Sequence, residues 1–150
     1  MLISKKSQYA LQAVLELALH AGAGPLKIAD IAKSQSIPVR FLEVILNQLK
    51  QAGLVVSRRG VRGGYSLGRA PQELTVSHVI ECIQGPITLA DGVGNISIVD
   101  DGTINGENVL VAFWQKAEAT ITQLVRQTTF RDLVEQHNRL SQDYVASYSI

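Results

Sequence analysis

The most chemically distinctive stretch of the chain is an arginine-rich loop, which reads Arg58-Arg59-Gly60-Val61-Arg62-Gly63. Guanidinium groups pair with phosphate oxygens, and they are attracted to narrow minor grooves, where the negative potential of DNA is concentrated. The glycines allow the backbone to reverse tightly, so that the arginines project from the reversal. An isolated loop of this composition is more often an ordinary solvated turn, and its neighbours decide between the two interpretations.

The elements that flank this loop predict a winged helix-turn-helix. Residues 54–57 and 64–67 have the composition of strands, which makes the loop the tip of a small β-hairpin. Before the hairpin, apolar residues at helical spacing predict helices over residues 28–34 and 38–51, and Gly53 ends the second one. The inward face of this second helix is predicted to carry Phe41, Leu42, Ile45, Leu46 and Leu49. Short helices joined by about three or four residues are typical of helix-turn-helix, whose second helix lies in a DNA groove. In this position the arginine tip is favoured as a DNA contact.

The distribution of charge favours a polyanion as the partner. The net charge is only +1, but residues 1–70 carry ten Lys or Arg against three acids, a net charge of +7. Residues 71–150 carry four basic residues against ten acids, a net charge of −6. The first half would attract phosphates and the second would be repelled by them. The alternative is that the charges only decorate solvated faces, which is the usual meaning of a charge run.

Further helices are predicted on either side of this module. The first spans residues 4–21 with Ser4 as its N-cap, and its side chains are apolar over most of its circumference, so several neighbours must cover it. Another helix spans residues 75–83, with Thr75 as its N-cap. Residues 85–108 have no helical period, and a loop of this length is usually functional or mobile.

A long helix is predicted over residues 107–127, followed by a short helix from Phe130 and a fraying end at residues 141–150. Its apolar residues follow the spacing of a coiled-coil seam. They are Leu110, Trp114, Ala117, Ile121 and Leu124. This stripe either packs on its own chain or forms a dimer. Dimerisation is favoured, because a helix outside a complete binding module has little of its own chain left to cover.

The expected fold is therefore mainly α, a winged helix-turn-helix with a small β-hairpin wing and a long C-terminal dimerisation helix. We expect a DNA-binding domain over residues 1–83, a loop in the sensor position over residues 84–106, and the dimerisation helix with a C-terminal tail over residues 107–150.

Several classes of protein do not fit the sequence. No window approaches 18 uninterrupted apolar residues, and the N-terminus does not have the order of a secretory signal, so we expect a cytoplasmic protein with no membrane partner. The one cysteine, Cys82, excludes an internal disulfide framework. No nucleophile–base pair, phosphate loop or metal cluster is present in the sequence, and we do not expect an enzyme.

Residues across the first half of the chain resemble the Rrf-two family of bacterial transcriptional regulators. The matching positions are Lys5, Tyr9-Ala10, Ile28-Ala29-Asp30-Ile31-Ala32, Phe41-Leu42-Glu43, Arg59-Gly60 and Gly63-Gly64-Tyr65-Ser66-Leu67. The resemblance implies a homodimer that binds an imperfect palindrome in double-stranded DNA. The implied DNA-binding residues are Lys5, Ser36, Val39, Arg40, Glu43, Asn47, Arg58, Arg59, Arg62 and Tyr65.

Among these residues, Glu43 is the most informative. A carboxylate is repelled by phosphates, so it is tolerable in this position if it accepts from a base donor such as cytosine N4, or if it orients an arginine. The alternative is an exposed carboxylate paired with Arg40 or Lys50.

The loop departs from the family pattern. Sensory members of the family hold an iron–sulphur cluster through cysteines in the loop that corresponds to residues 85–108, but this loop contains no cysteine. Cys82 precedes the loop and is interpreted as a buried small hydrophobe. A cation site at Asp91, Asp100 and Asp101 is weak, because their spacing does not match a calcium loop. We predict no metal site and no cofactor, with control by a partner protein or a small-molecule effector.

The resulting hypothesis is a dimeric, cluster-free DNA-binding transcriptional regulator, with repression as its expected mode. Two alternatives stay open. One is a protein-interaction module whose winged helix docks on a partner enzyme or polymerase, although an apolar patch would suit docking better than an arginine tip. The other is a regulator with an atypically ligated cluster.

Overall fold

The computed structural model describes residues 3–89 and 106–148, and the side chains of residues 106–108 are left out. Its elements in chain order are α1 (Lys5–Leu19), α2 (Ile28–Gln35), α3 (Val39–Gln51), β1 (Val55–Arg58), β2 (Gly64–Leu67), the 3-10 helix η1 (Pro71–Glu73), α4 (Val76–Gln84), α5 (Gly106–Gln127) and α6 (Phe130–Tyr148). The predicted mainly helical fold with one antiparallel hairpin is confirmed.

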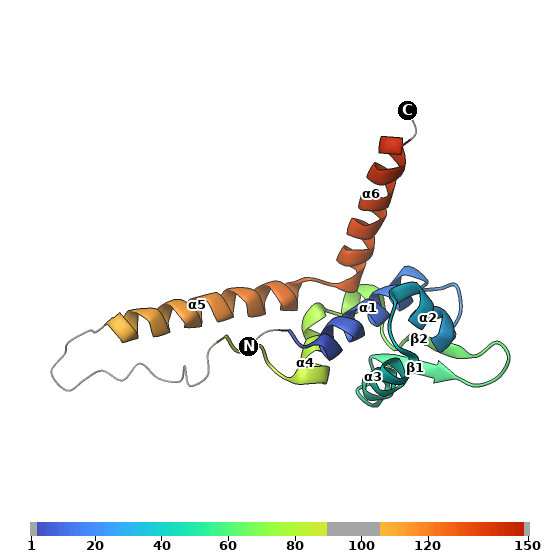
Figure 1. Cartoon of the computed structure of the whole chain (residues 1–150), viewed down its shortest axis with the longest axis horizontal. Helices are drawn as coiled ribbons and strands as arrows, with labels where there is room; N and C mark the ends of the chain where they lie inside the picture. The colour runs from blue at the N-terminus through green and yellow to red at the C-terminus, as the bar shows by residue number, and fades with distance from the viewer. Residues whose placement is uncertain (1–2, 90–105, 149–150) are drawn as a thin grey trace.

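Helix α1 lies within the compact part of the molecule, where it contacts α2, α3, α4, α6 and β2 (Figure 1). The prediction that several neighbours cover it is confirmed. Small residues such as Ala10 and Ala13 are fully buried on it, which lets the surrounding helices approach closely. Glu16 is the one acid on its buried side, and its carboxylate accepts a hydrogen bond of 2.8 Å from Gln35 Nε2 at the end of α2.

The predicted N-caps of two helices are confirmed. Ser4 Oγ accepts from the Ser7 amide at 3.0 Å at the start of α1. Thr75 Oγ1 accepts from the His78 amide at 3.3 Å, and the Thr75 amide donates to His78 Nδ1 at 3.0 Å. This reciprocal pair fixes the start of α4.

Helix α3 buries four of the five residues assigned to its apolar face. Leu42, Ile45, Leu46 and Leu49 are fully buried. The prediction that Phe41 also points inward is wrong, because its side chain is 59% exposed. Successive residues of a helix turn by about 100°, which places Phe41 on the flank of the buried stripe. Its ring instead lies beside Tyr9, with centroids 6.5 Å apart.

The hairpin pairs Val55 with Leu67 and Arg58 with Gly64. Its second strand also contacts the segment after α1, because Leu26 and Tyr65 exchange backbone hydrogen bonds of 2.9 and 2.7 Å. A Cβ on Gly64 would lie 2.3 Å from the Leu26 oxygen, and Gly64 has a φ of +143°. Glycine is therefore required where the hairpin crosses this segment.

The C-terminal helices leave the compact part of the molecule in different directions (Figure 1). Phe130, at the start of α6, is fully buried in the core of the winged-helix part, and its amide donates to the Leu74 oxygen at 2.8 Å. The prediction of a short last helix with a fraying end at residues 141–150 is wrong for residues 141–148, because α6 continues to Tyr148. The segment has neither glycine nor proline to stop the helix. The rings of Tyr144 and Tyr148, one turn apart, also contact each other, with their centroids 4.8 Å apart.

Within residues 3–89 and 106–148, no helix is both long and apolar enough to span a bilayer.

Candidate nucleic-acid interface

The outward face of α3 carries the side chains predicted to read bases. Arg40, Glu43 and Asn47 are exposed on it, and Val39, the first residue of the helix, is 43% exposed. They face away from the core because the apolar residues of the helix occupy the opposite side. The structure therefore brings these four residues onto one accessible surface.

Glu43 makes no ion pair with Arg40 or Lys50 in the described part of the chain. Lys50 instead extends toward the hairpin, where its Nζ donates to Ser57 Oγ at 3.4 Å. The pairing that would have made Glu43 an ordinary surface carboxylate is absent. Its oxygens are open to a donor from outside the chain.

The arginines of the hairpin are exposed. Strand β1 packs beside α3, and the loop between β1 and β2 projects away from the rest of the molecule (Figure 1). Arg58 ends β1, whereas Arg59 and Arg62 lie in the connecting loop. Lys27, which the sequence analysis missed, joins them: its Nζ donates to the Gly60 oxygen at 3.2 Å. No sequence signal links residues so far apart, because the contact depends on the packing of the hairpin against the α1–α2 connection.

The remaining predicted DNA-binding residues lie in different settings. Lys5 is exposed at the start of α1, with its Nζ 4.9 Å from the centre of the Tyr9 ring. Ser36 is exposed in the helix-turn-helix turn, with a left-handed φ of +53° that ends α2. Tyr65 is half-buried against the core, so its packing holds the hairpin in place.

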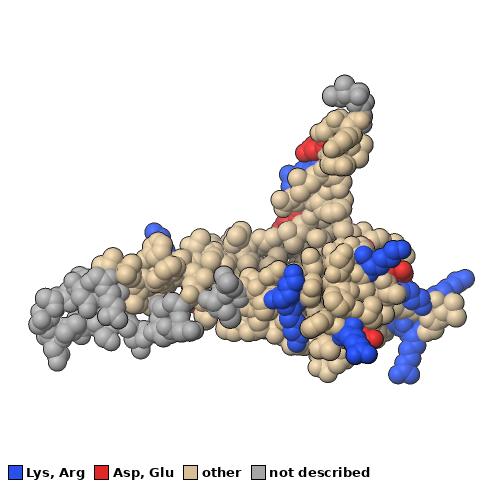
Figure 2. Space-filling view, in the orientation of Figure 1, with Lys and Arg blue, Asp and Glu red and all other residues tan. Residues whose placement is uncertain are grey.

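The basic side chains gather on this part of the molecule. Figure 2 shows lysines and arginines over α1, α3 and the hairpin, whereas α5 and α6 present few of them on this face. The uneven distribution of charge along the sequence thus corresponds to an uneven distribution of basic side chains on this face. A phosphate backbone would be attracted to the winged-helix end of the chain.

The predicted dimerisation residues lie elsewhere, on α5. Leu110, Trp114 and Leu124 are 59%, 42% and 63% exposed, and Ala117 and Ile121 are half-buried. The sequence analysis missed Val109 and Phe113, which are 59% and 57% exposed on the same helix. The Phe113 and Trp114 rings contact each other edge to face at 5.2 Å. A helix with this much exposed apolar surface is typical of an interaction site.

Comparison with known proteins assigns this chain to a family. Residues 3–136 match the sequence model of the Rrf2 (Rrf-two) family, described as an iron-dependent transcriptional regulator. This chain belongs to the Rrf2 family. It is a transcriptional regulator by descent and not an enzyme, as predicted.

Relatives match over most of their length. A protein of Mycobacterium tuberculosis strain H37Rv, named as an HTH-type transcriptional regulator, is 34% identical over 99% of this chain and 94% of its own length. IscR of Pectobacterium carotovorum is 33% identical over 89% of this chain and 79% of its own length. The solved structure of CymR, the global cysteine regulator of B. subtilis, covers 91% of this chain and 98% of its own, with 29% identity and a TM-score of 0.75. The predicted winged-helix fold is confirmed.

The donor set of this Rrf2 protein does not fit the iron–sulphur cluster of sensory family members. Cluster iron requires several thiolate or imidazole ligands. The chain has one cysteine, and in residues 3–89 and 106–148 no group of three or more His, Cys, Asp or Glu could hold a metal ion. Asp91, Asp100 and Asp101, the weak cation candidates, lie outside the described residues. Burial raises the pKa of the Cys82 thiol, an effect that nearby Lys6 partly opposes.

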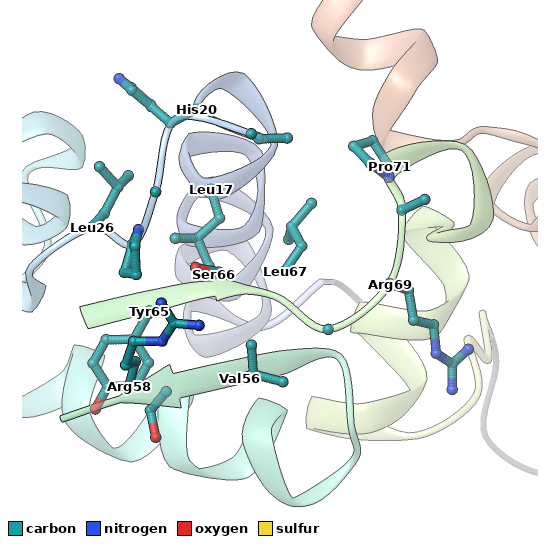
Figure 3. Close-up of a pocket in the computed structure, with 17 residues that line it drawn as sticks. Leu17, His20, Leu26, Val56, Arg58, Tyr65, Ser66, Leu67, Arg69 and Pro71 are labelled. Carbon is teal, nitrogen blue, oxygen red and sulfur yellow. The ribbon is translucent and has the colours of Figure 1, made fainter. Parts of the chain in front are cut away.

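A concave region of about 720 Å³ lies between the end of α1 and the outer side of the hairpin. In Figure 3 the Arg58 and Arg69 side chains lie at opposite ends of it, and His20 points away from it. The polar groups do not converge on a common point. The region therefore lacks the geometry of a specific small-molecule site in the Rrf2 protein.

Proposed function

We propose that this chain is a homodimeric DNA-binding repressor that recognises an imperfect palindrome without a cysteine-ligated cluster. The observation that carries the proposal is the open, basic surface made by α3 and the hairpin. Its proposed contacts are Lys5, Ser36, Val39, Arg40, Glu43, Asn47, Arg58, Arg59, Arg62 and Tyr65. In a two-fold dimer, this surface occurs twice and reads half-sites about 34 Å apart.

The proposed dimer forms through α5, with Leu110, Trp114, Ala117, Ile121 and Leu124 at its seam. The exposure of Leu110 and Trp114 supports this assignment, because two aromatic or aliphatic stripes that meet remove each other from water. We divide the chain into a DNA-binding domain over residues 1–83, a sensor-position loop over residues 84–106 and a dimerisation region over residues 107–150, whose helix α6 also packs on the DNA-binding domain through Phe130. A protein that binds the bacterial chromosome acts in the cytoplasm, and a partner protein or small-molecule effector would control it.

The test is selection of DNA from fragmented genomic DNA by the purified protein, followed by titration of the enriched sequence by fluorescence anisotropy. The expected result is a two-part motif whose affinity falls steeply as salt rises, since each neutralised phosphate releases counterions. Enrichment of no motif, with equal affinity for a scrambled sequence, would contradict the proposal.

A docking module remains the second candidate, because α3 also exposes Phe41 and Val44 at 59% and 57%. The same selection separates the two, since a docking module would enrich no DNA motif. The atypical-cluster alternative is tested by the visible spectrum and iron content of protein purified without oxygen. We expect no absorption in the visible range and no stoichiometric iron.

A further inference from the structure

Val44 is the apolar residue at the centre of the exposed face of α3. It lies two positions from both Leu42 and Leu46, which are fully buried, so it is turned about 200° from each of them. Its side chain is 57% exposed, and it is not part of the hydrophobic core that the described residues form. Phe41, the other strongly exposed apolar residue of α3, has a neighbour in Tyr9. Because Phe41 has this neighbour within the chain, Val44 is the candidate for an apolar contact with an outside partner.

The neighbours of Val44 on this face are polar. Arg40 lies one turn before it and Asn47 about one turn after it, and both are exposed. The three side chains therefore form a row along the helix, at positions i, i+4 and i+7. At a rise of about 1.5 Å per residue the row spans roughly 10 Å, the length of about three base pairs. A helix that places Arg40 and Asn47 against base edges places Val44 against the base between them.

Valine can read one feature of that base. The major-groove edge of thymine carries a 5-methyl group, whereas cytosine and adenine present amino donors and guanine presents acceptors. An apolar side chain gains by contact with the methyl group and leaves a polar edge without a partner. Valine is also stiff about χ1, so that little side-chain freedom is lost when the contact forms.

We propose that Val44 contacts the 5-methyl group of a thymine in the major groove and makes a T·A pair part of each recognised half-site. The inference rests on the proposed DNA-binding function and assigns a specificity-determining residue to it. Glu43 and the hairpin arginines cannot supply this selectivity, because they contact polar or charged groups.

The test uses the operator enriched in the genomic selection, with each thymine of one half-site replaced in turn by deoxyuridine, which lacks only the methyl group. The wild-type protein should lose affinity about fourfold at the contacted position, the value of one buried methyl group. Val44→Ala should bind the normal operator more weakly and show no loss on that replacement. Titrations at low salt keep the weaker variant measurable.

The matched control is Val56→Ala, because Val56 is a valine of similar exposure, 49%, that lies on β1 rather than α3. It should keep the wild-type response to every deoxyuridine. Tight operator binding that no replacement weakens would overturn the inference and leave the proposed function intact. An equal loss in Val44→Ala and wild type would do the same, since another group would then contact the methyl. If the selection enriches no operator, the proposed function and this inference fail together.

Discussion

Helices α3 and α5 are both amphipathic, but the apolar side of α3 is buried within the chain and that of α5 is largely exposed. On α3 the apolar stripe is covered: Leu42, Ile45 and Leu46 have no exposed surface. What remains open is the polar side. On α5 the opposite holds, because Leu110 and Trp114 are 59% and 42% exposed. The apolar side of α3 is thus buried within the chain, whereas much of the apolar side of α5 is exposed.

This difference indicates which part of the function belongs to one chain. The proposed DNA-binding surface is supported by contacts within one chain, which lie among residues 3–89 and α6. The exposed apolar side of α5 is where we propose that a second chain packs. Helix α4 lies between the two regions: Gln48 of α3 donates to the Cys82 oxygen at 3.0 Å, and Arg126 of α5 pairs with Glu81 at 3.8 Å. Helix α4 therefore contacts both α3 and α5, and a shift of α5 could reach α3 through α4.

The largest expected effect comes from charging the open side of α5. We predict that Leu110→Glu combined with Trp114→Glu weakens dimerisation by about a millionfold, because each lost anchor costs about 2 kcal/mol and occurs twice in a two-fold dimer. Sedimentation equilibrium measures the change. The helical circular dichroism should stay unchanged, since both positions are exposed.

The control for this variant is Ala119→Glu combined with Gln123→Glu. It adds carboxylates at the same spacing to exposed positions on the other side of the same helix. We expect this control to remain a dimer. Equal dissociation of the two variants would show that charge, rather than the apolar stripe, governs association, and the contrast between α3 and α5 would lose its basis.

The next effect concerns the arginine tip. We predict that Arg59→Ala combined with Arg62→Ala lowers operator affinity by about three orders of magnitude at 0.1 M salt. The slope of log K against log salt should fall in magnitude by about 3.6, because four phosphate contacts are lost per dimer. Anisotropy titrations over a range of salt concentrations measure both quantities.

Arg131→Ala combined with Arg139→Ala is the matched control, since it removes the same charge from exposed positions on α6. Its salt slope should equal that of the wild type. If both variants lost the same affinity, net charge alone would account for binding, and the hairpin would have no special part in it.

A smaller effect tests how firmly the hairpin is held. We predict that Gly64→Ala lowers the free energy of unfolding by about 3 kcal/mol, because the new Cβ would combine an unfavourable φ with a clash against the Leu26 backbone. Gly60→Ala is the control, since it has a φ of +105° and no atom within 4 Å of its added Cβ. It should cost only about 1 kcal/mol in urea titrations. An equal loss of unfolding free energy in the two variants would show that the clash with Leu26 contributes nothing.

Much of the fold could be predicted because short-range periodicity determines it. The helices over α1 to α4 and the hairpin follow from apolar spacing, caps and glycines, all of which act within a few residues. Phe41 was misassigned because a pattern of apolar residues does not define the exact edge of the buried stripe. The sequence analysis also placed Phe130 in a C-terminal helix but could not show that it enters the core of the winged-helix part, because that contact spans most of the chain.

The sequence was sufficient to predict which residue types form the candidate site, but not how all of them are arranged in space. Charged residues next to a helix-turn-helix can be named from sequence alone, as Arg40 and Arg59 were. The approach of Lys27 to Gly60 depends on how two distant segments pack. Val44 was passed over because the pattern was used only to find the apolar stripe, although helical spacing already turns it away from Leu42 and Leu46. The structure adds that its side chain is 57% exposed.

The smallest effect concerns Cys82, which lies on α4 between the two regions and approaches the Gln48 oxygen with its Sγ at 3.8 Å. Burial raises the pKa of this thiol above its ordinary value of 9.0, although Lys6 partly opposes the shift. The thiolate is the nucleophile, so alkylation by iodoacetamide at pH 8 should be several-fold slower in the folded protein than in urea. Mass spectrometry of timed samples measures both rates.

The same shift determines how stability should depend on pH. A thiol whose pKa is raised by folding stabilises the folded state below the unfolded value of 9.0, and that contribution is lost as pH rises through the folded pKa. The difference in unfolding free energy between the wild type and Cys82→Ser should therefore be constant up to about pH 8 and then shrink. Rapid alkylation of the folded protein at neutral pH would contradict the raised pKa of the Cys82 thiol. It would show that Cys82, on the helix between α3 and α5, is a reactive group rather than part of the packed winged-helix region.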